Sequence, residues 1–333
     1  MKNIKLISVI TLFVLLAGCG GNNQATDEFI TVDVTANYPK KELILQDFMD
    51  VEYVPLETTD EFITQGLVQD VGENIVIVRN RNDDGDIFIF DRKTGKGLKK
   101  INRKGQGGEE YTGILGITLD EDNGEMFVNN IYAKRILVYD LDGNYKRSLK
   151  VNEGNLYDEI YNFDQEHLIC HDALNENSGS LSLVNTGQSF MIISKQDGKV
   201  TEEIQIPFEE KKTAVIRYKD DNSEMTYAYL PSTIHSIVPY YDSYVLLDLS
   251  ADTVYSYSSD HTKKPLIART PSIQIMNPEV FLFLSILTDR YYFIESVKKE
   301  MEFSGADLLY DKQKKSLFRY TVFNDDYTNK ELV

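Results

Sequence analysis

The chain has 333 residues, of which 42% are hydrophobic and 26% charged, so its composition is that of a globular protein long enough to bury a core. Its 53 acidic residues outnumber its 35 basic residues, and the formal net charge is −18 at pH 7. Nucleic-acid binding needs basic surface to displace phosphate counterions, so this balance argues strongly against a nucleic-acid partner. The acidity is expected to serve solubility, although it would also suit the recruitment of cations or a basic partner.

The first 18 residues have the pattern of an export signal. Lys2 and Lys5 precede an apolar stretch from residue 6 to 17, which is too short to span a bilayer as a helix but suits a signal peptide. The Leu-Ala-Gly-Cys sequence at 16–19 resembles the bacterial lipobox, whose cysteine thiol receives lipid. This resemblance implies that Cys19 is the lipidated first residue of the mature protein and that residues 19–28 form a tether. The alternative is an ordinary signal peptide with an incidental cysteine.

Three short elements are predicted between the tether and the repeats. Residues 29–34 alternate apolar and polar side chains, which indicates a half-exposed strand. Residues 40–48 are expected to form one or two helical turns. Residues 51–56 are a predicted strand, and its proline, Pro55, suits an edge or a strand end.

Two near-copies of one hexapeptide, DIFIFD at 86–91 and RILVYD at 135–140, stand out in the next part of the chain. They start 49 residues apart (86 to 135), and each is followed by a short turn. Their apolar runs are continuous, so each strand is expected to be buried on both faces. A strand–turn–strand unit repeated at this interval is typical of a propeller blade. The sequence therefore predicts an all-β protein, a β-propeller of four-stranded blades spanning residues 29–333 as one domain.

Three weaker copies follow, so the sequence contains five repeats. The residues that end the five apolar runs (Asp91, Asp140, Lys195, Ser258 and Asp311) are 49, 55, 63 and 53 residues apart. The longer steps predict insertions between residues 172 and 189 and between residues 208 and 230.

A resemblance to a known family rests on three motifs. The RILVYD copy is similar to the Arg-Ile-x-Val-Phe-Asp core of NHL-type propeller repeats. The segments 54–58 and 103–111, together with the lipobox, resemble the six-bladed β-propeller lipoproteins of Bacteroidetes. The resemblance implies six blades, one more than the repeats counted. The strands at 29–34 and 51–56 are expected to supply part of the sixth, closing the ring beside the last blade; the alternative is an incomplete ring.

The histidines and acidic runs do not have the spacing of a metal site, and the sequence predicts no metal or other cofactor. His167 and His171 flank an apparent buried strand that includes Cys170, which places the imidazoles about 13 Å apart at roughly 3.3 Å per residue. That separation is too large for one zinc ion, so both are interpreted as structural. An EF-hand-like run at Asp120 has its glycine and its last ligand at the wrong positions. His235 lies in a predicted innermost strand, 232–237, and is expected to face the central channel as a binding residue, or else to be structural.

The glycine-rich segment at 105–108 is interpreted as a crossing between blades. A phosphate-binding loop needs lysine and a hydroxyl residue after its last glycine, whereas two glutamates, at 109 and 110, follow here. Arg103, Lys104 and Tyr111 flank the crossing and are expected to bind a ligand at one mouth of the channel. Alternatively, the two cations pair with the two glutamates.

Two functions remain open at this point. The first is a membrane-anchored, non-catalytic binding or scaffold module for a glycan, peptide or protein in the cell envelope, expected at the outer membrane and facing either side. The second is an NHL-like hydrolase or lyase with its site in the channel, which only the fold resemblance supports. The 21 tyrosines include clusters at 227/229, 240/241/244 and 291/292 that would stack on sugars, form a protein interface or pack blades, although the absence of tryptophan weakens the carbohydrate interpretation. Titratable groups converging at a channel mouth would favour the enzyme, and an apolar or tyrosine-rimmed mouth would favour binding.

Overall fold

The computed structural model describes residues 28–44, 52–82, 84–173, 187–219, 226–229, 235–300 and 303–323. The predicted signal peptide and Cys19 lie outside these residues. Within the described ranges, no helix is long and apolar enough to cross a membrane. The regular structure is nearly all β-strand, as predicted.

Over the described residues, the body consists of five antiparallel sheets, each built around four strands that are consecutive in the chain. We number these sheets as blades one to five. Blade one contains β3 (Leu67–Val71), β4 (Ile75–Arg79), β5 (Asp86–Asp91) and β6 (Gly97–Asn102). Blade two contains β7 (Gly116–Asp120), β8 (Glu125–Asn130), β9 (Arg135–Asp140) and β10 (Tyr145–Lys150). Blade three contains β11 (Tyr157–Asn162), β12 (His167–Asp172), β13 (Phe190–Ser194) and β14 (Val200–Ile204).

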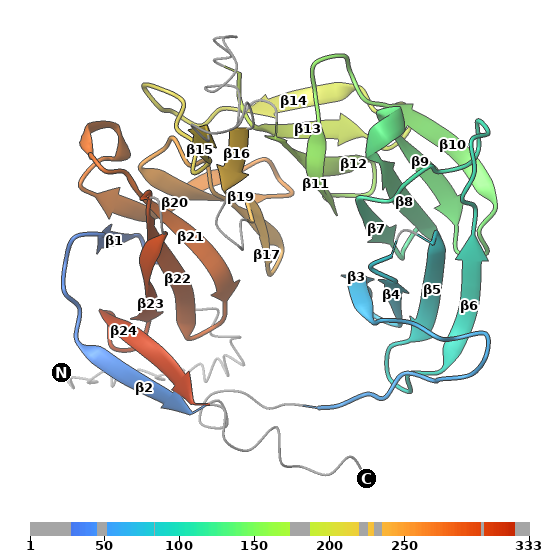
Figure 1. Ribbon diagram of the computed structural model, residues 1–333, viewed down its shortest axis with the longest axis horizontal. Helices are drawn as coiled ribbons and strands as arrows, with labels where there is room; N and C mark the ends of the chain where they lie inside the picture. The colour runs from blue at the N-terminus through green and yellow to red at the C-terminus, as the bar shows by residue number, and fades with distance from the viewer. Residues whose placement is uncertain are drawn as a thin grey trace, which may run out of the picture.

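Blade four contains β17 (Ile237–Tyr240), β18 (Ser243–Leu246), β19 (Thr253–Ser258) and β20 (Lys263–Thr270). Blade five contains β21 (Val280–Leu287), β22 (Tyr291–Lys298), β23 (Ser304–Asp311) and β24 (Ser316–Phe323). The blades stand side by side in an arc, with the first strand of each toward the centre and an open side between blade five and blade one (Figure 1). The five predicted repeats are therefore confirmed as five blades.

The equivalence of the two hexapeptides is also confirmed, since β5 and β9 are the third strands of adjacent blades. The four central residues of each strand are buried. Alternate side chains of β9 enter different interfaces: Leu137 and Tyr139 pack with blade one, whereas Ile136 and Val138 pack with blade three. This alternation explains why the sequence shows a continuous apolar run without a polar face.

The N-terminal strands lie elsewhere than predicted. β1 (Ile30–Asp33) pairs in parallel with β20, as a fifth strand of blade four. β2 (Lys40–Ile44) pairs in parallel with β24 of blade five, so the helical prediction is wrong for these residues. Leu43 of β2 is buried against Tyr291 and Phe293, and this tertiary contact together with the β24 pairing outweighs the local helical pattern. Residues 45–48 of that prediction lie outside the described ranges.

Residues 52–56 do not form the predicted strand. Residues 55–57 nevertheless contact blade one in the way that the outer strand of blade one contacts blade two. A Cβ added to Gly143 of blade two would come within 2.8 Å of Ile101 in β6, the outer strand of blade one. A Cβ added to Gly95, the corresponding turn position of blade one, would come within 2.0 Å of the Pro55 carbonyl oxygen. The Glu57 amide donates to the Gly95 carbonyl at 2.8 Å, and its carboxylate accepts from the Gly97 amide at 2.9 Å. The segment 51–56 was predicted to lie beside the last blade, but its described part packs against the first blade instead.

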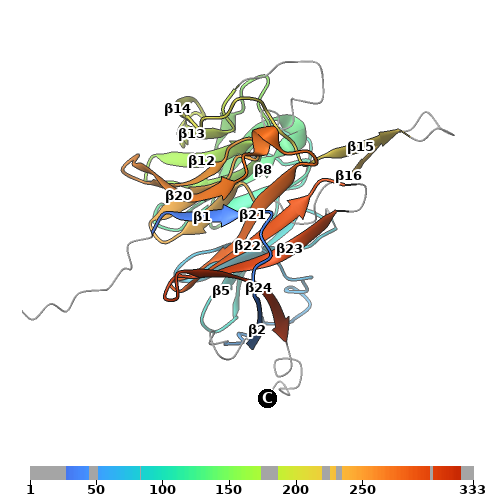
Figure 2. The ribbon, with the colours of Figure 1, turned by 90° about the vertical axis from the view of Figure 1, so that its left-hand side faces the viewer.

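The longer repeat steps correspond in part to an added hairpin. β15 (Ile216–Lys219) and β16 (Thr226–Tyr229) form a separate two-stranded sheet that projects from the body (Figure 2). This hairpin confirms the insertion predicted between residues 208 and 230. Most of the other predicted insertion, residues 174–186, lies outside the described ranges.

Candidate functional site

The glycine-rich crossing between blades one and two is held from inside by Tyr111. The side chain of Tyr111 is completely buried, and its hydroxyl donates to the Gly85 carbonyl at 2.6 Å while accepting from the Arg103 amide at 2.8 Å. Burial raises the pKa of Tyr111 to about 12. Because no part of this ring reaches the surface, the prediction that Tyr111 contacts a ligand is corrected: it fixes the crossing.

The two propeller motifs of the sequence meet at this crossing. The guanidinium of Arg135, from the RILVYD copy, donates hydrogen bonds of 2.9–3.0 Å to three carbonyl oxygens within residues 107–110. The hydroxyl of Tyr139 donates to a fourth carbonyl of the same segment at 2.7 Å. Two of the motifs that carry the family resemblance therefore contact each other, and this contact joins neighbouring blades.

The other predicted binding residues do not form one site. Arg103 and Lys104 are exposed, and Arg103 donates from Nε to the Gly143 carbonyl at 2.9 Å. Arg103 also lines a shallow polar cavity of about 470 Å³, together with residues 107–110 and Asn144 and Tyr145. His235 is exposed and precedes β17 of blade four instead of lying within an inner strand.

His167 and His171 lie at the start and near the end of β12, which confirms the predicted strand around Cys170. Each imidazole has its own carboxylate partner: Nδ1 of His167 lies 3.0 Å from Asp164, and Nδ1 of His171 lies 2.7 Å from Asp158. Over the described residues, no group of three histidine, cysteine or acidic side chains is arranged to hold a metal ion.

Two carboxylates on the innermost strands are engaged by the backbone of an adjacent blade. Glu159 of β11 accepts hydrogen bonds from the amides of Ser236 (2.7 Å) and Ile237 (3.1 Å), which joins blade three to blade four. Asp70 of β3 accepts from the Leu119 amide at 2.7 Å, which joins blade one to blade two. Burial raises the pKa of Asp70 and raises that of Glu159 to about 7. These contacts give both groups a structural role between blades.

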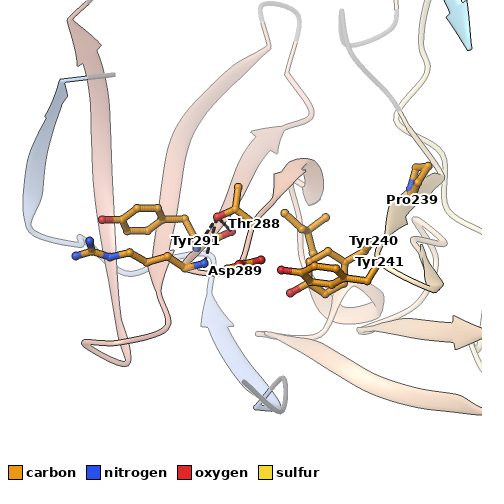
Figure 3. A pocket seen from close by; sticks show the side chains of 8 residues that line it. Pro239, Tyr240, Tyr241, Thr288, Asp289 and Tyr291 are labelled. Atoms are coloured by element: carbon orange, nitrogen blue, oxygen red, sulfur yellow. Dashed lines mark hydrogen bonds between the residues drawn. The ribbon is translucent and has the colours of Figure 1, made fainter. Parts of the chain in front are cut away.

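A cavity of about 450 Å³ lies between the β17–β18 turn of blade four and the β21–β22 turn of blade five (Figure 3). Three tyrosines contribute to its walls, and the turn of blade five adds a hydroxyl side chain and two charged ones. It is lined by Pro239, Tyr240, Tyr241, Leu287, Thr288, Asp289, Arg290 and Tyr291. Its mixture of aromatic and polar groups is what small-molecule and side-chain pockets generally contain. This cavity, hereafter the tyrosine pocket, is the candidate site.

The turn of blade four presents one tyrosine to solvent. Tyr240 pairs with Ser243, so the turn consists of two residues, and Tyr241 adopts a left-handed backbone with φ 49°. This conformation is uncommon for a bulky side chain and recurs at functional sites. The Ser243 hydroxyl stabilises the turn by donating to the Tyr240 carbonyl at 2.8 Å. As a result, 61% of Tyr241 is exposed, with its ring centroid 4.6 Å from that of the buried Tyr240.

The turn of blade five supplies the charges. The Thr288 hydroxyl accepts from the Tyr291 amide at 2.9 Å, which fixes the turn and leaves Asp289 exposed. The Arg290 guanidinium lies 4.8 Å from the Tyr291 ring centroid and 3.6 Å from the buried carboxylate of Asp311. In Figure 3, the rings of Tyr240 and Tyr241 are directed toward the Asp289 side of the pocket.

The pocket was not predicted from the sequence, although its tyrosines were noted as two clusters. The available signal was the run of tyrosine beside acidic residues in turns, at 240–242 and 289–292. Nothing local indicates that two turns separated by about fifty residues meet, because that contact follows from the equivalent positions of the turns in adjacent blades.

Comparisons with known proteins agree with this architecture. The chain matches the family DUF5128, described as a 6-bladed beta-propeller, over residues 21–333. It is similar in structure to a Bacteroides fragilis NCTC 9343 protein described as exported (BF0058), with a TM-score of 0.57 and 13% identity over 88% of this chain and 80% of that one. It is also similar to a member of the duf4221 family from Bacteroides vulgatus, with a TM-score of 0.42 and 11% identity over 80% of this chain and 83% of that one.

None of the curated proteins matches the chain in sequence. The family match spans nearly the whole chain, and the described residues hold five blades of the propeller that its description names. The predicted resemblance to six-bladed propellers is thereby confirmed, and the protein belongs to the DUF5128 family of 6-bladed β-propellers.

Proposed function

We propose that the protein is a non-catalytic binding module of the cell envelope, held at the membrane by lipid on Cys19, and that it captures its ligand in the tyrosine pocket. The exposed ring of Tyr241, held over the pocket by a left-handed turn, is the observation that carries this proposal. A strained turn that displays an aromatic ring to solvent gains nothing for the core, but it suits recognition. The channel carboxylates Asp70 and Glu159 support binding over catalysis, since backbone amides of adjacent blades occupy them.

The envelope location rests on the lipobox and on the similarity to a protein described as exported. Several acyl chains on one cysteine, at about 0.8 kcal/mol per buried CH₂, would anchor the protein stably. A net charge of −18 is compatible with an envelope partner and unfavourable for nucleic acid. Arg103, which lines the polar cavity at the crossing, and the neighbouring Lys104 remain a proposed second contact.

Photo-crosslinking in living cells, with the crosslinker built into the protein, tests the proposal. Benzoylphenylalanine replaces Tyr241 in one variant and Tyr132 in a matched control, since Tyr132 is an 81% exposed tyrosine of blade two. The variant with the probe at 241 should give a discrete adduct, whether protein or glycan, that the control at 132 does not give. Identical adduct patterns from the two positions would contradict a binding role for the pocket.

A further inference from the structure

The tyrosine pocket combines groups of opposite charge with an aromatic surface, which restricts the chemistry of its ligand. Asp289 is an exposed acceptor, whereas Arg290, with 40% of its side chain exposed, is a donor from the next position in the same turn. Lys312 donates to the Tyr240 hydroxyl, and its ammonium lies 4.3 Å from the Tyr292 ring centroid. An anionic and a cationic side chain from one turn therefore line the same pocket as Tyr241.

This arrangement disfavours a ligand with a strong charge of either sign. A cationic group that approaches Asp289 also approaches Arg290 of the same turn, and an anionic group that approaches Arg290 meets Asp289 and the Asp311 carboxylate that Arg290 already contacts. A neutral ligand with hydroxyl groups avoids both repulsions, since each hydroxyl donates to a carboxylate or accepts from a guanidinium.

The exposed ring supplies the second requirement. A flat aromatic surface binds a ligand that has an apolar face, and a pyranose ring presents C–H groups on its face and hydroxyls around its edge. A cavity of about 450 Å³ lies within the range of small-ligand sites, and its walls place Pro239 and Leu287 beside the polar groups. Resting on the proposed binding function, we propose that the pocket binds a neutral pyranose residue of a glycan, with the sugar face on Tyr241 and its hydroxyls hydrogen-bonded by Asp289 and Arg290.

Calorimetric titration of the full mature protein in detergent tests this assignment. The probes are neutral hexasaccharides of glucose, mannose, galactose and xylose, with hexagalacturonate as the anionic comparison and chitosan hexamer as the cationic one. At least one neutral hexasaccharide should bind more tightly than both charged probes. Tyr241→Ala should weaken that binding about tenfold or more because the stacking surface is lost, whereas Tyr241→Phe keeps the ring and should stay within about threefold.

Two further variants separate recognition from folding. Asp289→Asn, on an exposed turn, should weaken sugar binding without lowering the melting temperature, and Tyr132→Ala should change neither. Binding that survives Tyr241→Ala and Asp289→Asn unchanged, preference for a charged probe, or no binding of any neutral hexasaccharide would overturn the glycan assignment. If a protein adduct still forms from position 241 in cells, only the glycan assignment fails; if neither adduct nor sugar binding occurs, the proposed function fails with it.

Discussion

Glu159 joins two blades through a single carboxylate, and its protonation follows from that position. Burial raises its pKa from 4.5 to about 7, against the lowering effect of nearby His171 and of the amides of Ser236 and Ile237. The folded protein therefore binds a proton more tightly at this site than the unfolded chain does. The contribution of Glu159 to folding stability should fall as pH rises from about 4.5 to about 7, because the folded state must then hold a buried charge.

This dependence is testable by urea unfolding at pH 4.5 and 7.5. Glu159→Gln should remove a decrease on the order of 3 kcal/mol from the wild-type profile between these pH values, since the amide does not titrate. Asp158, His171 and Asp70 remain in the variant and keep their own contributions. An unchanged difference between the two pH values in Glu159→Gln would show that the carboxylate is not the titrating group.

At the scale of elements, the crossing at 103–111 illustrates what the sequence could and could not predict. The crossing itself was predicted from its glycines and the two glutamates, but the burial of Tyr111 was not, because its partners Gly85 and Arg103 converge only in the folded blades. The role of Arg135 was also missed, since its carbonyl partners lie about 25 residues earlier in the chain. By contrast, β5 and β9 were predictable because burial on both faces leaves a continuous apolar run.

The contact made by Arg135 should contribute measurably to stability. Arg135→Ala removes three hydrogen bonds to the crossing and should lower the free energy of unfolding by about 2–3 kcal/mol. Arg81→Ala, at an exposed position of blade one, is the matched control and should stay within about 0.5 kcal/mol. Chemical denaturation of both variants gives the comparison, and equal stability would mean that the crossing holds without Arg135.

The packing of the third strands gives a stronger effect. Val138→Asp places a carboxylate in the fully buried interface between blades two and three and should destabilise the protein by several kcal/mol. Ser148→Asp introduces the same residue at an exposed position of the adjacent strand β10 and should have little effect. If Val138→Asp melts within a degree of Ser148→Asp, β9 is not a core strand.

For the whole molecule, the sequence predicted the five repeats that form the blades. It did not predict where the N-terminal strands β1 and β2 pair at the end of the arc. The repeats at Asp91 and Asp140 specify their own strands, whereas β1 and β2 pair with strands more than two hundred residues away. No local pattern encodes such a pairing, and the alternation at 29–34 gave only the element type. The tyrosine pocket belongs to the same class of feature, because it exists only where blades four and five are adjacent.

The anchor is also a property of the whole molecule. Cys19→Ala should leave the protein unprocessed or misplaced, because the residue that accepts lipid is gone, whereas Cys170→Ala changes a buried core cysteine and should leave anchoring intact. Fractionation of membranes and soluble envelope contents measures the result. Normal processing and membrane partition of Cys19→Ala would contradict the lipoprotein assignment.

If the proposed function holds, a ligand occupies the tyrosine pocket while the protein is in the envelope. Hydroxyl-radical footprinting of intact cells and of the purified protein measures this directly, with Tyr241 and Tyr132 as two exposed tyrosines of the same chain. Because a bound ligand covers its ring, Tyr241 should be oxidised several-fold less in cells than in the purified protein, while Tyr132 should react equally in both. Equal reactivity of Tyr241 in the two samples would contradict the proposed function.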